Sequence, residues 1–175
     1  MKKFIGAICS GVAGALMFLW LSLDWFVNKV TFPGMGSESE GITGWQLLTN
    51  KIDGQDAGLE MFKGAYTLHR VAAIVMLVAA CLLVAYAVVL LLKNLNVIKA
   101  NFKFNLVNNI LLTVLAVAAI VAVVGVMVMA AGLLKEIPAE AADYYKVFAG
   151  VGAWLAVAVS VVACGCGWAL ARKDK

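Results

Sequence analysis

Cysteine is the side chain of this sequence best suited to redox or metal chemistry, and the 175 residues include four cysteines. All of them, Cys9, Cys81, Cys164 and Cys166, fall inside long apolar runs. A membrane thiol oxidoreductase needs cysteine pairs within reach of its partners, and reactive cysteines are at least partly exposed. Cys164 and Cys166 are two residues apart, which turns their side chains to different sides of a helix. We interpret the cysteines as small packing residues, with a metal or redox role as the alternative.

The one histidine of the sequence, His69, is the candidate for a haem or metal ligand. A four-helix membrane cytochrome needs such a ligand at mid-depth, usually as a pair of histidines, but His69 stands next to Arg70 at the margin of an apolar run. We interpret it as a residue of the membrane interface. The sequence also shows no glycine-rich phosphate loop and no Ser/His/Asp constellation. We therefore expect no cofactor, no bound metal and no enzymatic activity.

Charged side chains are absent from the deep parts of the apolar runs. Intramembrane charge usually marks an ion path, a proton relay or a substrate site, so its absence argues against a pump or coupled transporter working as a single chain. Asp24 and Arg70 lie at the margins of the first two runs. They could form an ion pair there, or each could lie independently among lipid headgroups.

The positions of these side chains depend on four apolar runs, at residues 4–27, 71–92, 106–134 and 147–171. The chain is 64% hydrophobic and 14% charged, whereas soluble domains average about 45–50% and roughly 25%. This composition excludes a soluble enzyme, a disordered chain and a disulfide-rich secreted domain. Each run can cross a hydrocarbon layer of about 30 Å at 1.5 Å per residue. The third is longer than needed, so it tilts or projects beyond the bilayer.

The sequence therefore predicts an all-α membrane protein, in which residues 1–175 form one domain, a bundle of four transmembrane helices. The large connection at residues 28–70 and the short one at 135–146 lie on one side of the membrane. Residues 93–105 and both termini lie on the other.

Basic residues show which side is cytoplasmic, because Lys and Arg are enriched in cytoplasmic segments. The termini and residues 93–105 together carry eight basic residues and one acid, a net charge of +7. The rest of the chain carries six basic and nine acidic residues, a net charge of −3, which completes the total of +4. We expect both termini to be cytoplasmic. The positive net charge then reports orientation and does not indicate a nucleic-acid partner.

The first apolar run could also be read as a signal peptide, because Lys2 and Lys3 precede it and Ala13-Gly14-Ala15 resembles a cleavage site. However, the run continues well past that site. Cleavage would also leave an odd number of spans, with the basic middle connection and the basic tail on opposite sides. We interpret the run as an uncleaved membrane anchor.

The outer connection at residues 28–70 is predicted to be partly helical, although the fold of residues 28–55 is left open. Trp45 lies in a short apolar stretch and is interpreted as an interface anchor or a plug on the helix ends, with a contact to a partner or ligand as the alternative. Residues 56–70 show the apolar spacing of an amphipathic helix that leads into the second span, with Leu59, Phe62, Tyr66 and His69 on its apolar side. Asp56 is the expected N-cap of this helix. Pro138 similarly predicts a helical first turn before the fourth span.

Small residues recur every four positions in the first and fourth spans, a spacing that lets membrane helices approach closely. The stripes consist of Gly6, Ser10 and Gly14, and of Gly152, Ala156 and Ser160. Packing within one bundle and docking of another subunit both remain open. Asn108 and Asn109, at the inner start of the third span, are interpreted as residues that snorkel or cap the helix.

The layout resembles that of the claudin-like tetraspan proteins, which have cytoplasmic termini, a large first outer loop and a long third helix. Gly44-Trp45 is similar to the end of the family's Gly-Leu-Trp motif, and Arg70 precedes an Ala-rich second span as the family's Arg does. The resemblance implies a sheet in the outer loop, but the two cysteines that staple the family's sheet are absent here. The lysine-rich, short-looped layout and residues 43–48 also resemble small inner-membrane proteins of bacteria, the membrane that we favour.

These features favour a non-catalytic membrane protein that acts as a scaffold or accessory subunit of a larger complex, through its outer loop and small-residue helix faces. The expected partners are the lipid bilayer and other membrane subunits or further copies of the chain. The alternative is an oligomeric channel or small-solute transporter. A membrane enzyme acting on lipids or thiols has the least support.

Overall fold

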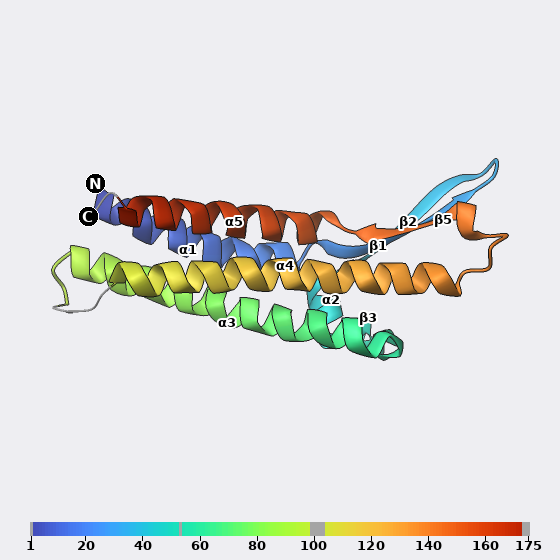
Figure 1. Ribbon diagram of the computed structural model, residues 1–175, viewed down its shortest axis with the longest axis horizontal. Coiled ribbons are helices and arrows are strands. Elements are labelled where there is room, and N and C mark those ends of the chain that lie inside the picture. Colours follow the sequence, from blue (N-terminus) through green and yellow to red (C-terminus); the bar gives the residue numbers. More distant parts are fainter. Residues whose placement is uncertain (1, 53, 99–103, 173–175) are drawn as a thin grey trace.

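The computed structural model describes residues 2–52, 54–98 and 104–172. Four helices run alongside one another, and the two ends of the chain lie at the same end of the molecule (Figure 1). They are α1 (Lys2–Leu21), α3 (Lys63–Asn94), α4 (Phe104–Glu136) and α5 (Val151–Arg172). Helix α3 packs against α1 and α4, and α5 packs against α4 and α1, so the four helices surround a shared core.

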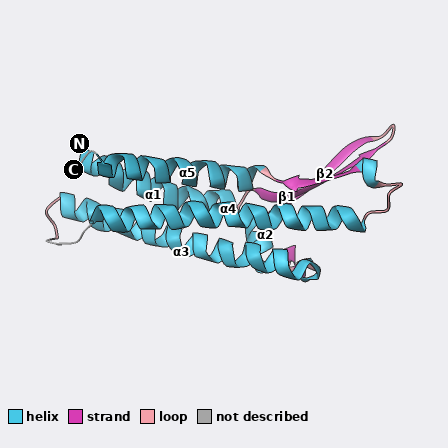
Figure 2. Ribbon diagram, in the orientation of Figure 1, coloured by secondary structure: helices cyan, strands magenta, loops and turns pink. Residues whose placement is uncertain are grey.

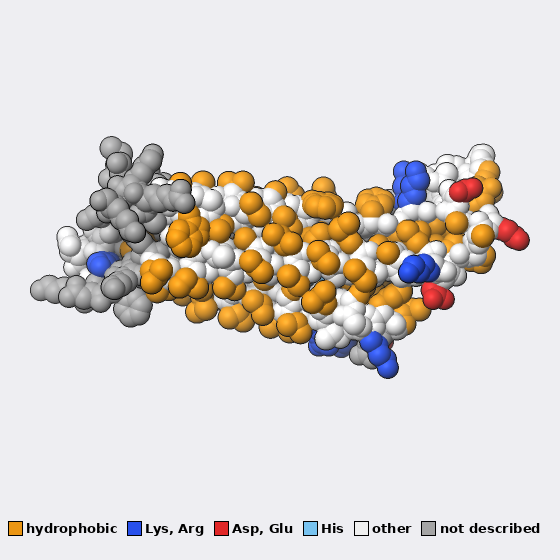
Figure 3. Space-filling model, in the orientation of Figure 1, with side chains coloured by type: hydrophobic (Ala, Val, Ile, Leu, Met, Phe, Trp, Pro, Cys, Tyr) orange, Lys and Arg blue, Asp and Glu red, His pale blue; other side chains and the backbone are white. Residues whose placement is uncertain are grey.

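Three of these helices are long and apolar enough to cross a membrane: α3, α4 from Leu106 to Glu136, and α5 from Val151 to Ala169. In α1 the apolar segment found in this way is shorter, Ala7–Leu21. Large apolar side chains also face outward, as for Val71, Val78 and Leu82 on α3, which are 50–56% exposed. Hydrophobic side chains cover the middle of the molecule, and the charged ones lie toward its ends (Figure 3). This pattern is expected of helices surrounded by lipid.

The end of the molecule away from the termini carries a three-stranded antiparallel sheet with strand order β2-β1-β5 (Figure 2). Strands β1 (Asp24–Phe32) and β2 (Gly36–Thr43) form a hairpin, and β5 (Tyr145–Ala149) pairs with the other edge of β1. The sheet therefore combines residues from both predicted outer connections. It forms although the chain's four cysteines are all free, so the disulfide of the claudin-like proteins is not needed for it.

The rest of the first outer connection packs back onto the helix ends. Helix α2 (Gly44–Thr49) begins with a capping box, in which Thr43 and Gln46 satisfy each other's backbone N–H groups. The short strands β3 (Lys51–Ile52) and β4 (Gln55–Asp56) follow, and then the 3-10 helix η1 (Leu59–Phe62) leads into α3. Leu47 anchors α2, because its side chain is completely buried.

Two predicted span boundaries are wrong, and for the same reason. Residues 24–27 belong to β1 and not to the first helix, which ends at Leu21, while residues 147–149 belong to β5, before α5 begins at Val151. Both segments are rich in aromatic and β-branched residues, and hydropathy does not separate a short apolar strand from the end of a helix.

The predicted helix starts in the outer connections also need correction. Asp56 does not cap a helix: its Oδ1 accepts hydrogen bonds from the Asn50 amide group at 2.6 Å and from the Gly58 N–H at 2.9 Å, and helical structure begins only at η1. After Pro138 the chain forms the short 3-10 helix η2 (Ala142–Tyr144) and then β5. On the predicted apolar side of residues 56–70, Leu59, Tyr66 and His69 are buried and Phe62 is partly buried.

The exceptional length of α4 serves the end of the molecule that carries the sheet, which we call the outer end. Its 33 residues extend about 50 Å, roughly 20 Å more than the hydrocarbon thickness of a bilayer. Beyond Gly125, which contacts His69, the helix continues past Phe62 at Gly132. Val126, Met129 and Ala130 are buried there. The extra length of α4 therefore forms part of a protein core beneath the outer segments.

Candidate functional site

The outer ends of the helices meet around one aromatic pair, Trp25 and His69, which we call the Trp25–His69 junction. The two rings contact each other edge to face, with centroids 5.6 Å apart and an interplanar angle of 71°. A register shift between Asp24 and Phe26 interrupts the pairing of β1 with β2. At this irregularity Trp25 is completely buried, and its Nε1 donates a hydrogen bond of 2.9 Å to the Trp20 carbonyl.

Three glycines allow other elements to approach this junction. A Cβ atom at Gly44 in α2 would lie 2.9 Å from Trp25 Nε1, and one at Gly152 in α5 would lie 2.9 Å from Trp25 Cδ1. A Cβ atom at Gly125 in α4 would lie 2.9 Å from the Cβ of His69. Real Cβ atoms avoid such distances, so only glycine permits this packing. The junction therefore joins β1, α2, α3, α4 and α5.

The structure corrects the interpretation of His69 as a residue that faces the membrane interface. Its imidazole is completely buried, and Nδ1 donates a hydrogen bond of 3.0 Å to the Ala122 carbonyl, which can only accept. Nε2 is buried without a hydrogen-bond partner in the described part of the chain. Within that part, no three His, Cys, Asp or Glu side chains are grouped so that they could hold a metal ion. The side chain of His69 thus belongs to the protein core between α3 and α4.

Asp24 and Arg70 lie in different surroundings. The carboxylate of Asp24 lies directly against Gly41 of β2, where a Cβ atom would overlap it. Arg70 is exposed on α3 and lines a groove. Among the described residues, no ion pair joins the two side chains. Of the two alternatives that the sequence left open, the ion pair is therefore not formed in this structure, and the position of each side chain among lipid headgroups stays a prediction.

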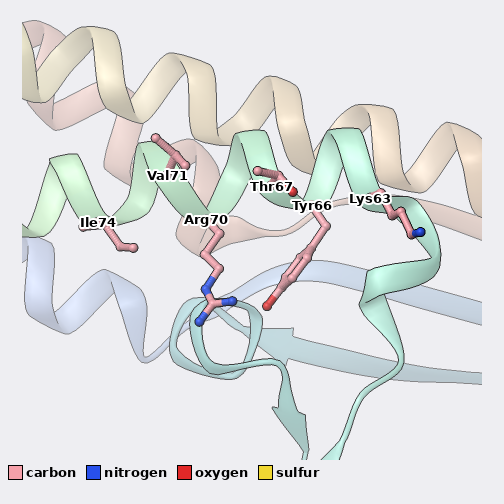
Figure 4. A pocket seen from close by; sticks show the side chains of 6 residues that line it. All are labelled: Lys63, Tyr66, Thr67, Arg70, Val71 and Ile74. Carbon is pink, nitrogen blue, oxygen red and sulfur yellow. The ribbon is translucent and has the colours of Figure 1, made fainter.

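The groove beside Arg70 has a volume of about 500 Å³ and follows one face of α3 (Figure 4). The side chains of Arg70 and Tyr66 extend from α3 toward the α2 turn. Its lining consists of Lys63, Tyr66, Thr67, Arg70, Val71 and Ile74. The spacing of these residues in threes and fours places them on one side of the helix. We call it the α3 groove.

Comparison with known proteins finds no matching family model, curated protein or solved structure. The function has to be inferred from the geometry of this chain.

Trp45 lies in α2 and is 37% exposed, whereas Gly44 and Leu47 of the same helix are buried. Helix α2 thus packs through Gly44 and Leu47, while the indole ring of Trp45 faces outward. Trp154, in the first turns of α5, is 52% exposed. Exposed tryptophans on two elements at this end of the helices are typical of the boundary between a membrane and water.

The small-residue stripes lie largely inside the bundle. A Cβ atom at Gly14 would lie 2.7 Å from the Ala80 carbonyl oxygen of α3, and Ser10 is buried. In α5, Ala156 and Ser160 are completely buried, and the Ser160 hydroxyl donates to the Ala156 carbonyl. The environment of Gly6 lies outside the described residues. The described members of the stripes therefore serve packing within one chain.

A cluster of hydrogen-bonded polar side chains, which was not predicted from the sequence, lies at the opposite end of the helices. Asn108 and Asn109 are buried, which corrects their interpretation as snorkelling or capping residues. The Ser10 hydroxyl donates to Asn108 Oδ1 at 2.7 Å, and Thr113 donates to the Asn109 carbonyl at 2.7 Å. Trp168 Nε1 donates to Thr113 Oγ1 at 3.2 Å. We call these five residues the inner polar cluster. The signal for it was two adjacent amides, with a threonine one helical turn later, in an apolar run.

Of the four cysteines, Cys164 lies beside the inner polar cluster. Cys9, Cys81 and Cys166 are exposed on helix surfaces, and Cys164 is half-buried. The Cys164 sulfur lies 3.5 Å from Thr113 Oγ1, a weak contact that suits a packing role.

Proposed function

We propose that the protein is a multi-pass membrane protein with four spans, α1 together with α3, α4 and α5. We also propose that both termini lie in the cytoplasm. Helix α1 packs against α3 and α5, and its apolar segment continues the belt that these helices form. The distribution of basic residues supports the orientation, with a net charge of +7 on the side of the termini and −3 on the side of the sheet. The bacterial inner membrane is the membrane that we propose, on the basis of the lysine-rich, short-looped layout.

We further propose that the protein is a non-catalytic scaffold or accessory subunit of a larger membrane complex, and that the outer sheet is its docking platform. The observation that carries this proposal is a sheet, built from both outer connections, that extends beyond the ends of α1 and α5 alongside the last part of α4 (Figure 1). A resemblance to the claudin-like tetraspan proteins remains part of the proposal, because a sheet in the outer loop is what that resemblance implies.

The outward face of the sheet has the composition of a contact surface. Lys29 and Lys146 lie directly opposite each other on β1 and β5, although like charges in this position destabilise a sheet. Phe148, on the same face of β5, is 46% exposed, whereas Val147 faces inward and is buried. Two cations beside an exposed aromatic ring suit a partner protein with an acidic surface.

Site-specific photo-crosslinking in intact membranes tests the docking role. A crosslinking amino acid replaces Phe148 in the sheet or, as a control, the exposed Lys51 in β3 on the same side. We expect a discrete heavier adduct from the sheet position and none from the control. The double charge reversal Lys29→Glu and Lys146→Glu should remove the adduct. A protein that runs as a monomer on native gels and gives no adduct from the sheet would contradict the proposal.

The same experiment separates the alternative function, an oligomeric channel or small-solute transporter. Adducts formed between two tagged copies of the chain, together with a solute flux into vesicles containing the purified protein, would favour that alternative. An adduct with a different protein favours the scaffold.

The orientation is tested by labelling single cysteines with a membrane-impermeant maleimide in a variant that lacks the four native cysteines. A cysteine at Ser37, near the hairpin turn, should react from outside intact cells. A cysteine at Asn101 should react only after the membrane is permeabilised. The reverse pattern would contradict the proposed topology.

A further inference from the structure

The α3 groove lies at the level where the charge-free part of α3 begins. Lys63 begins its lining, Arg70 follows two helical turns later, and Val71 and Ile74 end it (Figure 4). From Val71 to Leu92 the helix carries no charged side chain. The groove is therefore amphipathic along the axis of α3, with its cationic part toward the sheet and its apolar part toward the middle of the molecule.

Contacts between the helices place this groove at the membrane boundary by a second route. Gly152 of α5 contacts Trp25, and Trp25 contacts His69, the neighbour of Arg70 on α3. The exposed Trp154 therefore lies close to the level of Arg70. Trp45 belongs to α2, toward which Arg70 and Tyr66 extend (Figure 4). Exposed tryptophans mark the headgroup layer, so the cationic part of the groove lies at headgroup depth.

The lining of the groove suits a phosphate group. Its six side chains include two cations and no acid. The guanidinium group of an arginine can donate two parallel hydrogen bonds to phosphate oxygens, and a lysine adds a mobile positive charge. The exposed side chains of Val71 and Ile74, which follow Arg70 toward the middle of the molecule, suit the first carbons of an acyl chain. A free phosphate ion would contact only the cationic part of the groove.

We propose that the α3 groove is a binding site for an anionic glycerophospholipid of the leaflet nearest the sheet. Arg70 binds the headgroup phosphate, Lys63 adds positive charge about 10 Å nearer the sheet, and Val71 and Ile74 contact the acyl chain. This site does not depend on the docking role of the sheet, so the two proposals can fail separately.

The proposal is tested with the full-length protein in a neutral detergent. The affinity for dioleoyl-phosphatidylglycerol is measured from the rise in Tm during a titration, beside dioleoyl-phosphatidylcholine and inorganic phosphate. We expect the anionic lipid to bind at least about fivefold more tightly than the zwitterionic one, since one charge near a membrane surface contributes about 1 kcal/mol. Binding should weaken as the salt concentration rises.

Charge variants locate the site. Lys63→Gln and Arg70→Gln should each weaken phosphatidylglycerol binding about fivefold, and the double variant about thirtyfold. Both side chains are exposed, so these changes should leave the helix content measured by circular dichroism unchanged. The matched control is the double variant Lys51→Gln and Lys135→Gln, which removes the same charge from the same side of the molecule and should alter binding less than about twofold.

Steric variants test the groove itself without changing any charge. Thr67→Trp fills the lining between the two cations and should abolish the preference for the anionic lipid. Leu68→Trp places the same ring at the next position, outside the lining, and should preserve the preference. Equal binding of both lipids, equal losses in the charge control, an undisturbed Thr67→Trp variant, or equally tight binding of inorganic phosphate would each overturn the proposal.

Discussion

The two ends of the helix bundle are held together by different interactions. At the outer end, the Trp25–His69 junction brings five elements together by close packing around aromatic rings, and glycines make room for it. At the opposite end, the inner polar cluster links α1, α4 and α5 by hydrogen bonds between side chains in an apolar setting. The outer end thus depends on shape, and the inner end on polar pairing.

This difference matches the number and kind of elements that each end has to hold in place. The outer junction must fix helices, a sheet and α2 in one arrangement, which requires a rigid core of matched shapes. The inner end fixes helices only, and hydrogen bonds between membrane helices set their rotation at modest free-energy gain, about 0.6 kcal/mol on average. Substitutions in the Trp25–His69 junction should therefore have larger effects than substitutions in the inner polar cluster.

The largest loss is expected for Trp25→Ala. Removing a completely buried indole should lower the free energy of unfolding by about 3–5 kcal/mol, because it leaves a cavity where five elements meet. The measurement is reversible unfolding in mixed micelles, followed by circular dichroism. Trp154→Ala is the control, since that ring is exposed, and should cost less than about 0.5 kcal/mol. Equal losses in the two variants would contradict the proposed role of the junction.

A smaller loss is expected when a glycine of the junction gains a side chain. Gly125→Leu places atoms against His69 and the Ala65 carbonyl, so α3 and α4 must separate, at a cost of about 1–3 kcal/mol. Gly165→Ala in α5 is the matched control. No atom lies within 4 Å of the added Cβ there, so the change should be neutral or stabilising, by up to about 1 kcal/mol. A neutral Gly125→Leu would show that the helices do not need this close approach.

The inner polar cluster should show a modest pairwise effect. A double-mutant cycle of Ser10→Ala and Asn108→Leu should give a coupling free energy of about 0.6–1.7 kcal/mol, because the two side chains share one buried hydrogen bond. The cycle is measured by the same unfolding assay. A coupling above that of any pair at the outer junction would reverse the comparison between the two ends.

The smallest effect is expected for the charges at the outer end. Asp24→Asn and Arg70→Gln should show additive free energies of unfolding, with a coupling below about 0.5 kcal/mol, because the two side chains form no ion pair. A larger coupling free energy in the double-mutant cycle would show that the two side chains form the ion pair that the sequence allowed. Electrostatic attraction would then contribute to the stability of the outer end.

The sequence predicted the helical, membrane-compatible character of this chain because long uncharged apolar runs are typical of helices that cross a bilayer. It also predicted which face of residues 56–70 turns inward, since the helical period is visible in Leu59, Tyr66 and His69. A sheet was implied only by the resemblance to the claudin-like proteins, and the contribution of the second outer connection to it was not predicted, because that contact is non-local. Phe26 pairs with Ala149 from the other outer connection, and no short-range pattern in either segment records that pairing.

The candidate site was predicted in pieces. His69 and Arg70 were recognised as candidate site residues. Their adjacent positions gave no indication that the His69 ring turns into the core while the Arg70 side chain lines a groove. Trp25 was read as the end of a helix, so its central position was not predicted. Asn108 and Asn109 looked like the polar start of a span because hydropathy averages over the faces of a helix, whereas burial depends on the face.

The central position of β1 has a consequence for the order in which the protein is made. β1 is among the first outer segments to be synthesised, but one of its two edges pairs with β5, which directly precedes the last helix. Until the ribosome has passed Ala149, that edge of the hairpin has no partner strand. Completion of the outer sheet therefore reports that the segment directly before the last helix has been synthesised, and a chain stopped before β5 would display an open strand edge that quality-control proteases and chaperones can recognise.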